Sequence, residues 1–256
     1  MREMQFREFR RDSLKTLASL WSIRTIIALG AGAYAGLRST GPDMELTADN
    51  YFDDSRLMDF RMQGNFGIVP EDIEAMQALE WVDEAEGGYS LDATLTLGEN
   101  YIVKLHSLSP LGLNAPKVVN GTLPQQANEC ALEQRTMASF GLALGDKITL
   151  DTSAGALEDP LAGTTFTITA VVDSPLYISL ERGTSSIGNG SVDAFMLLPE
   201  AAFQIEYFTD LYIRSDQLAP LNTFSREYTD AVDRLRPELE AVAEKRGEIR
   251  YDEIYN

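Results

Sequence analysis

The chain has 256 residues and a formal net charge of −19 at pH 7. Such an acidic chain repels a phosphate backbone, which argues against nucleic acid as a partner. Its one cysteine, Cys130, and one histidine, His106, exclude an intrachain disulfide and a Cys/His zinc site.

The first predicted element is a transmembrane helix over residues 17–38. Residues 17–37 read LASLWSIRTIIALGAGAYAGL, about the ~20 residues that a bilayer-spanning helix needs. Residues 1–38 hold seven basic and three acidic side chains, a net of +4, so residues 39–256 carry −23. Because Lys and Arg accumulate at the cytoplasmic end of a span, we expect a cell-membrane protein with its N-terminus in the cytoplasm. Its acidic main domain is then extracellular.

Two features of this span are unusual. Arg24 lies inside it, where a cation costs about 2.5–3.5 kcal/mol on insertion scales, although snorkelling toward the inner surface relieves part of that cost. Ala28, Gly32 and Gly36 recur at every fourth position. A stripe of small residues lets helices approach closely within a membrane. We therefore expect the span to pack against other transmembrane helices, which this sequence does not contain.

The N-terminal segment allows a second interpretation. Residues 33–35 (AYA) resemble the cleavage site of a signal peptide. Against cleavage, the apolar run is long for a signal sequence and contains an arginine. Residues 1–16 place Phe6, Phe9 and Leu14 among arginines, which predicts a cytoplasmic amphipathic helix on the inner membrane surface.

The outer part begins with a polar neck over residues 40–54, helical or extended, and then shows strand-like patterns. Alternation of apolar and polar residues with β-branched enrichment is typical of half-buried strands. The hairpin signal Gly98-Glu99-Asn100 joins two of these runs. The predicted strands cover residues 57–63, 89–97, 101–107, 129–132, 147–151, 165–173, 193–198 and 209–214.

Short helices and breaks lie between these strands. Pro70 and the acids after it predict a helix over residues 71–80. A second helix is expected over residues 135–140, closed by Gly141. The paired glycines 87–88 predict a break. Further, residues 121–124 predict a turn and residues 184–190 (TSSIGNG) a loop.

From residue 223 onward the pattern becomes helical. Val232, Leu235, Leu239 and Val242 repeat at intervals of three and four, which resembles the start of a coiled coil, bent at Pro237. The sequence stops without a cap or stop signal, so its end is interpreted as a cut. Strands interrupted by short helices and followed by a long helix predict an α+β fold. The expected domains are residues 1–16, 17–38, 39–222 and 223–256.

The sequence predicts no catalytic, cofactor-binding or metal-binding residues, and hence a non-catalytic protein. The nearest approach to a phosphate-binding loop, residues 141–147, has the wrong glycine spacing and places Asp146 where phosphates would sit. His106 is expected to be packed or at the surface rather than a base, and Cys130 to be a small buried side chain. Ser185 and Ser186 lack the spacing of a nucleophile elbow, and the acid pairs 53/54 and 84/86 are of a kind expected by chance.

Three stretches resemble a known family. Residues 6–44, reading FREFRRDSLKTLASLW…IIALGAGAYAGLRSTGPDM, resemble the opening of FtsX/MacB-type ABC transporter permeases of Gram-positive bacteria. Residues 120–150, with a G-x-x-P turn, an E-C-x-L strand and an L-G-D-x-I-x-L strand, resemble the extracytoplasmic core domain of that superfamily. Residues 166–190, ending in SPLYISLERGTSSIGNG, resemble the same group of large permeases. Arg24 departs from the family, in which that position is usually apolar.

The resemblance implies a fragment of a permease subunit. Residues 39–222 would be a MacB-like extracellular core domain, which couples ATP hydrolysis by a separate cytoplasmic ABC ATPase to transport or to other extracytoplasmic work. Further implied partners are the lipid bilayer and the remaining transmembrane helices of a longer chain. An extracellular peptide, lipoprotein or cell-wall enzyme is the implied object of the work. The resemblance carries over no site residues, since Gly121, Pro124 and Gly145 match turn positions only.

Two other functions compete with this one. The chain could be a single-span, surface-anchored binding or scaffold protein, in which case residues 1–256 are the whole gene product. It could also be an anchored hydrolase that uses carboxylates without a recognisable motif.

Overall fold

The computed structural model describes residues 2–155, 157–179 and 181–255, without the side chains of residues 2–16 and 18. The first element is a single helix, α1 (Arg2–Asp54), which contains Pro42 and includes the predicted neck. The chain forms two compact units that divide after Ala48. The amphipathic face predicted for residues 1–16 lies outside the described side chains, so it stays a prediction.

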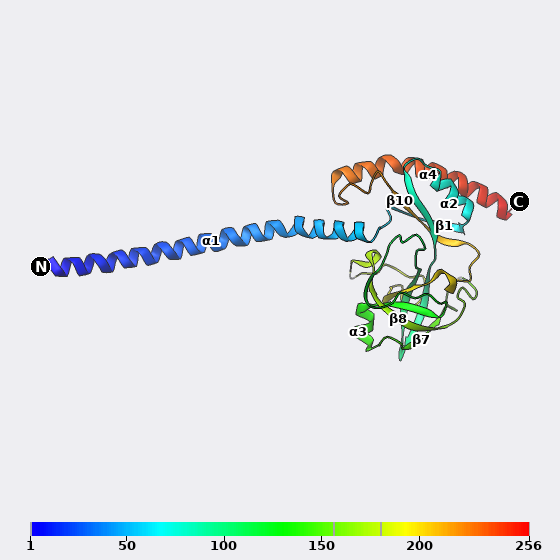
Figure 1. The fold of residues 1–256 in the computed structure, drawn as a ribbon, viewed down its shortest axis with the longest axis horizontal. Helices are drawn as coiled ribbons and strands as arrows, with labels where there is room; N and C mark the ends of the chain where they lie inside the picture. Colours follow the sequence, from blue (N-terminus) through cyan, green and yellow to red (C-terminus); the bar gives the residue numbers. More distant parts are fainter. Residues whose placement is uncertain (1, 156, 180, 256) are drawn as a thin grey trace. The chain divides into compact units, whose positions relative to one another are not determined.

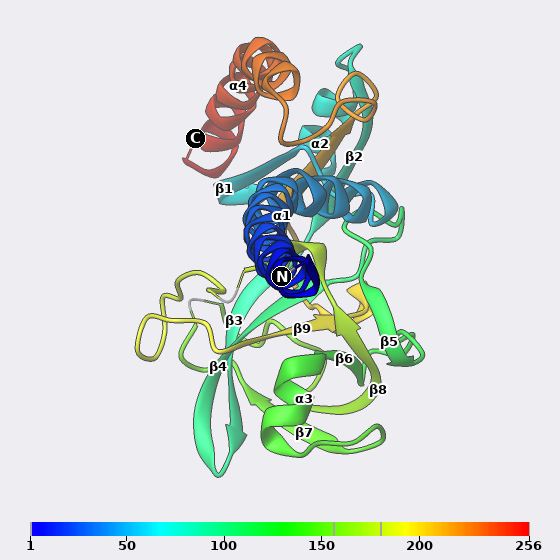
Figure 2. The ribbon, with the colours of Figure 1, turned by 90° about the vertical axis from the view of Figure 1, so that its left-hand side faces the viewer.

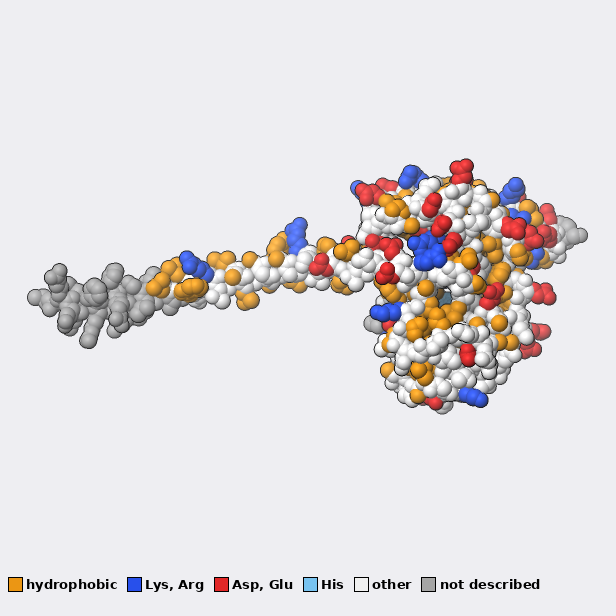
Figure 3. Space-filling view, in the orientation of Figure 1, with side chains coloured by type: hydrophobic (Ala, Val, Ile, Leu, Met, Phe, Trp, Pro, Cys, Tyr) orange, Lys and Arg blue, Asp and Glu red, His pale blue; other side chains and the backbone are white. Residues whose placement is uncertain are grey.

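The first unit carries the predicted membrane span. Among the described residues, one helical stretch, Ser19–Asp54, is long and apolar enough to cross a bilayer, and none of its apolar window is buried. Leu29 is 73% exposed and Leu37 is 80% exposed, and hydrophobic side chains cover this stretch in Figure 3. The Arg24 guanidinium lies 5.8 Å from the centre of the Trp21 ring, close enough for a cation–π contact. These apolar side chains are unburied within the chain itself, as a lipid-facing helix requires.

The second unit begins with a small antiparallel sheet covered by two helices. Its strand order is β1-β10-β2, with β1 (Phe60–Ile68), β2 (Val82–Gly88) and β10 (Phe208–Ser215). The helices α2 (Pro70–Gln77) and α4 (Arg226–Tyr255) lie together against this sheet (Figure 1). Met76 of α2 and Leu239 of α4 contribute to a core with Trp81 and Leu211.

The larger sheet closes on itself. Its strand order is β5-β8-β6-β9-β4-β3-β7, and β7 also pairs with β8. Because β7 is hydrogen-bonded to both β3 and β8, six of these strands form a ring, with β5 attached outside it on β8 (Figure 2). The strands are β3 (Ser90–Leu97), β4 (Glu99–Ser107), β5 (Lys117–Gly121), β6 (Glu129–Glu133), β7 (Lys147–Asp151), β8 (Thr165–Asp173) and β9 (Ala194–Leu198).

Side chains from every strand of the ring fill its interior. Leu95, Leu132, Ile168 and Met196 are almost completely buried there. Alternation along each strand sends every second side chain inward, which is the pattern of a small filled barrel. The helix α3 (Gln134–Phe140) and two 3₁₀ turns, Pro175–Tyr177 and Glu200–Ala202, complete the unit.

The α+β fold class predicted from the sequence is confirmed. The strands predicted over residues 147–151 and 165–173 have the observed bounds, and the hairpin turns at Gly98 with a φ of 82°. The helix α3 ends at Gly141 in the left-handed conformation, as its glycine C-cap predicted. The loop over residues 184–190 contains no named strand, only a bridge between Thr184 and Ser191.

The predicted break at residues 87–88 is wrong. Both glycines lie in β2, a strand that the sequence analysis missed. A Cβ atom at Gly87 would lie 2.4 Å from the Phe208 ring, and one at Gly88 would lie 2.5 Å from the Tyr212 ring. The glycines are therefore needed because aromatic rings of β10 pack directly on the backbone of β2.

Two further differences concern strand positions. The strand predicted over residues 57–63 is observed as β1, Phe60–Ile68, since the chain turns at Arg56 with a positive φ of 47° and pairing starts later. The turn predicted over residues 121–124 follows β5, which was missed because its five residues are all exposed and show no alternation of burial. Exposed edge strands give little hydrophobic signal.

The apolar seam of α4 faces its own domain. Leu235, Leu239, Val242 and Ala243 pack against the core under the small sheet. This contact explains the intervals of three and four as one buried helix face. A coiled coil that starts in this helix stays a prediction, and α4 is a single helix that includes Pro237.

Gly121 and Gly145, the two glycines at the turn positions named above, allow a matched test of backbone strain. Gly121 and Gly145 both have positive φ, 84° and 91°. A Cβ atom at Gly121 would lie 2.2 Å from the Thr169 carbonyl oxygen, whereas one at Gly145 meets nothing within 4 Å. Gly145→Ala should lower the free energy of unfolding by about 1–2 kcal/mol through left-handed strain alone. Gly121→Ala should cost a further ~1–3 kcal/mol from the clash.

Chemical denaturation of the two variants in mild detergent, followed by circular dichroism, measures this difference. Equal losses in both variants would contradict the close approach of β8 to Gly121.

Candidate functional site

The described residues contain no group of three or more His, Cys, Asp or Glu side chains that could hold a metal ion. The carboxylates of the acid pair 84/86 have structural partners. Glu84 accepts a hydrogen bond from Arg56 Nη2 at 2.5 Å, and Glu86 accepts one from Ser109 Oγ. Burial raises the pKa of Glu86, and the hydrogen bond from Ser109 opposes that rise.

His106 is packed in the interior, one of the two positions expected for it. It is 3% exposed in β4, and its Nε2 atom lies 2.6 Å from the Tyr177 hydroxyl. Burial, followed by the charges of Arg61 and Lys104, lowers the pKa of His106 to about 3. The imidazole is therefore neutral at physiological pH and shielded from solvent, which does not suit a general base.

Cys130 is also buried, as predicted. Its side chain is completely inaccessible in β6, and burial raises the pKa of its thiol to about 12. The thiolate is the reactive form of cysteine, so Cys130 is inert in the folded protein. Ser185 Oγ donates a hydrogen bond to Asp92 at 2.8 Å, and Asp92 is paired with Lys104 at 2.8 Å. That serine therefore helps to hold a loop.

The first candidate feature is a set of contacts that ties the end of α1 to residues 222–224, the segment before α4. Asp49, 8% exposed, accepts hydrogen bonds from Asn222 Nδ2 at 2.8 Å and from the Thr223 backbone N–H at 2.7 Å. Phe52 stacks on Phe224 with ring centres 6.1 Å apart. Hydrogen bonds to a charged acceptor are about twice as strong as neutral ones.

A second carboxylate continues these contacts into the small sheet. Asp59 accepts hydrogen bonds from Tyr228 Oη at 2.9 Å and from the Ser215 backbone N–H at 2.8 Å. Burial raises the pKa of Asp59, and these two hydrogen bonds partly offset that rise. We call Asp49, Asn222, Thr223, Asp59 and Tyr228 the neck network. Its first part joins the last turns of α1 to the segment before α4, and its second part joins Asp59 to the first turn of α4 and the end of β10.

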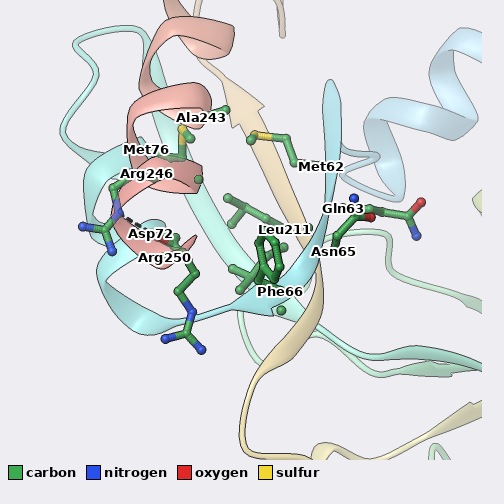
Figure 4. A pocket seen from close by; sticks show the side chains of 14 residues that line it. Met62, Gln63, Asn65, Phe66, Asp72, Met76, Leu211, Ala243, Arg246 and Arg250 are labelled. Carbon is green, nitrogen blue, oxygen red and sulfur yellow. Dashed lines mark hydrogen bonds and ion pairs between the residues drawn. The ribbon is translucent and has the colours of Figure 1, made fainter. Parts of the chain in front are cut away.

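The second functional feature is an open groove between β1, α2 and α4. Its volume is about 250 Å³. Met62, Phe66, Met76 and Leu211 provide apolar walls, and Arg246 and Arg250 project from α4 (Figure 4). The groove exists because β1 bulges: Gln63 pairs with Asp210 but Ile68 pairs with Phe208, so residues 64–67 loop out of the ladder.

Neither feature was predicted from the sequence. Asp49 and Asp59 stand beside apolar residues in segments interpreted as a neck and a strand, and a buried carboxylate was not inferred at either position. Gly64 and Gly67 are the first and last residues of the bulge and lie in the interior of β1. Glycine in a strand interior often marks a bulge, so this signal was available for the groove.

Comparison with known proteins finds similarity only to solved structures. No protein-family model matches the chain, and no curated protein sequence matches it. The extracellular domain of the noncanonic ABC-type transporter YknZ from Gram-positive bacteria aligns at 10% identity, covering 60% of this chain and 75% of that one, with a TM-score of 0.40. The periplasmic region of MacB from Actinobacillus actinomycetemcomitans aligns at 12% identity, covering 71% and 82%, with a TM-score of 0.40.

A domain of a protein described as a permease from Porphyromonas gingivalis aligns at 16% identity, covering 70% of this chain and 77% of that one, with a TM-score of 0.35. These neighbours agree with the resemblance to FtsX/MacB-type permeases that the sequence motifs carry. At such TM-scores they add no weight to an assignment of function, which therefore rests on the chain's own residues.

The pKa of His106 gives a testable pH dependence. An exposed histidine in the unfolded chain has a pKa of about 6.5, whereas that of folded His106 is about 3. Below pH 6.5 the unfolded chain thus binds a proton that the folded chain does not, and stability is lost as pH falls from about 6.5 toward 3. The expected slope is about 1.4 kcal/mol per pH unit, and His106→Gln should remove it.

Urea unfolding between pH 7 and pH 5, monitored by the fluorescence of buried Trp81, measures the slope. Tyr177→Phe is the matched control, because it removes the hydrogen bond but keeps the histidine, and should keep the slope. An unchanged slope in His106→Gln would contradict a neutral buried imidazole.

The neck network predicts a local effect. Asp49→Ala should lower the free energy of unfolding by about 2 kcal/mol, because it removes two charge-assisted hydrogen bonds. The start of α4 should then open more often. Hydrogen exchange at residues 222–228 should therefore be faster in this variant. Exposed Asp54 lies in the same helix, and Asp54→Ala is the control that should leave that exchange unchanged; similar acceleration in both would argue against a specific tie.

Proposed function

We propose that the chain is part of an ABC transporter permease subunit of the FtsX/MacB type, with a cytoplasmic N-terminus and an extracellular main domain. In this proposal a separate cytoplasmic ABC ATPase supplies the energy, and the outer domain passes the resulting motion to transport or other extracytoplasmic work. The three motif-bearing stretches, residues 6–44, 120–150 and 166–190, support it.

The observation that carries the proposal is the continuity of α1. One helix includes the apolar stretch and ends inside the folded unit, where Phe52 is 8% exposed. Asp49 in that end is bonded to Asn222 and Thr223, just before α4. Asp59, which follows α1, is bonded to Tyr228 of α4 and to Ser215 of β10. In this proposal, a displacement of the span reaches the outer domain through the last turns of α1 and the hydrogen bonds that Asp49 accepts there.

The groove favours a second function. An apolar groove with a charged rim is typical of ligand sites, which suits a single-span, surface-anchored binding protein. The two functions differ in what they require of other chains, because only the permease needs an ATPase and further transmembrane helices.

The permease proposal predicts a stable complex. The native protein, extracted from its membranes in mild detergent through an affinity tag, should bring down an ABC ATPase that has no membrane spans of its own. Mass spectrometry identifies the partner and gives the intact mass of the tagged protein. An intact mass equal to that of residues 1–256, with no ATPase bound, would favour the surface-anchored binding protein. A mass that corresponds to a chain beginning after residue 35 would show signal-peptide cleavage.

The orientation is checked in intact cells with a membrane-impermeant maleimide. Cys130 gives no background because its thiol is buried and its pKa is raised to about 12. Glu158→Cys, at an exposed position, should be labelled from outside, whereas Ser13→Cys should be labelled only after lysis. The reverse result would contradict an extracellular main domain.

A further inference from the structure

The groove beside α4 combines an apolar interior with cations in an acidic protein. Ile68, Met76 and Leu211 are 5%, 1% and 1% exposed and belong to the core beneath the groove. On the α4 side the wall is made of small residues, Ala243 and Gly247. A Cβ atom at Gly247 would meet nothing within 4 Å, so the space along this helix is open.

Two arginines line the rim of the groove, although the chain as a whole is strongly negative. The charged side chains that line it are Arg246, Arg250 and Asp72. Arg246 Nε is paired with Asp72 at 2.6 Å, and Arg250 Nη1 with Glu253 at 2.9 Å. Arg250 Nε is buried and has no hydrogen-bond acceptor among the described residues. A buried donor without an acceptor is unfavourable, and an anionic group in the groove would supply the acceptor.

The direction of the β1 side chains restricts the occupant further. Met62 and Phe66 face the groove, whereas Gln63 and Asn65 point away from it (Figure 4). Gln63 instead donates to Asp210 at 2.9 Å. A peptide would bring backbone N–H and C=O groups that need partners. The charged side chains on the walls are two guanidinium groups and the Asp72 carboxylate, which is already paired with Arg246. An alkyl chain needs no such partners.

Two methionines make this interior adaptable. The side chains of Met62 and Met76 lie at the same end of the groove (Figure 4). Methionine is flexible and polarisable, and it is used at surfaces that accommodate varied apolar ligands. At about 250 Å³, the groove is smaller than the ~300–1,000 Å³ of pockets for drug-sized ligands, so it suits one chain rather than the two of a phospholipid.

We propose that this groove binds a single-chain fatty carboxylate, with the alkyl chain along Met62, Phe66 and Met76 and the carboxylate on Arg250. A guanidinium group binds a carboxylate through two parallel hydrogen bonds. This inference does not depend on the permease proposal, because it concerns the chain alone and holds whether or not an ATPase associates.

The test uses the whole chain in phosphatidylcholine nanodiscs. A photoreactive decanoate, with a diazirine near its methyl end, should crosslink to peptides of β1, α2 and α4. Unlabelled decanoate should compete with the probe. Each methylene removed from the competitor should weaken its affinity about fourfold, the value for loss of one buried CH₂. A decyltrimethylammonium probe of the same length should not label these peptides.

Two pairs of variants locate the site. Gly247→Leu fills the open space and should abolish labelling, whereas Ala241→Leu adds the same side chain at an exposed position of α4 outside the groove and should retain it. Arg250→Gln should lower the affinity for decanoate at least about tenfold, because a charge-assisted contact is lost. Lys245→Gln removes an exposed cation of the same helix that does not line the groove and should have no effect.

Three results would overturn the inference. They are equal labelling by the anionic and cationic probes, full labelling of Gly247→Leu, and displacement of the probe by an apolar–acidic peptide but not by decanoate. Failure of ATPase co-purification would leave this test unaffected, so the two proposals fail separately.

Discussion

A fully buried carboxylate on the central strand of the small sheet holds the two sheets of the domain together. Asp210 is completely inaccessible, and a charge in that position is tolerated only when it is well paired. It accepts hydrogen bonds from Arg61 Nε at 2.7 Å, Gln63 Nε2 at 2.9 Å and Thr209 Oγ1 at 2.9 Å. Thr209 Oγ1 in turn accepts from the backbone N–H of Ser90 at 2.6 Å, where the barrel strand β3 begins.

The chain itself passes between the sheets at the same place. One residue, Tyr89, separates β2 from β3, and it is buried between Phe203 and Phe208 at ring distances of 4.8 and 5.1 Å. The hydrogen bonds around Asp210 and the aromatic packing of Tyr89 therefore lie at one joint, the connection between the small sheet and the barrel. The groove depends on this joint as well, because Gln63 is drawn toward Asp210 on one side of β1 and leaves Met62 and Phe66 on the other.

Local patterns in the sequence predicted the strands and helix ends that depend on neighbouring residues alone. The alternation in residues 147–151 and 165–173 predicted β7 and β8, and Gly141 predicted the end of α3. Long-range contacts determined the rest. Gly87 and Gly88 are in a strand because rings of β10 lie on them, and the seam of α4 is covered by a sheet whose strands come from distant segments. Asp49, Asp59 and Asp210 accept hydrogen bonds from Thr223, Ser215 and Gln63, which lie 147–174 positions away, beyond the reach of any window of sequence.

The last contact of the neck network has a mechanical consequence. Ser215, the end of β10, is bonded to Asp59, and β10 is flanked by antiparallel partners along both of its edges. A pull applied at Ser215 along the strand direction loads the ladders on both edges in shear. In that geometry the hydrogen bonds of a ladder give way together rather than one after another.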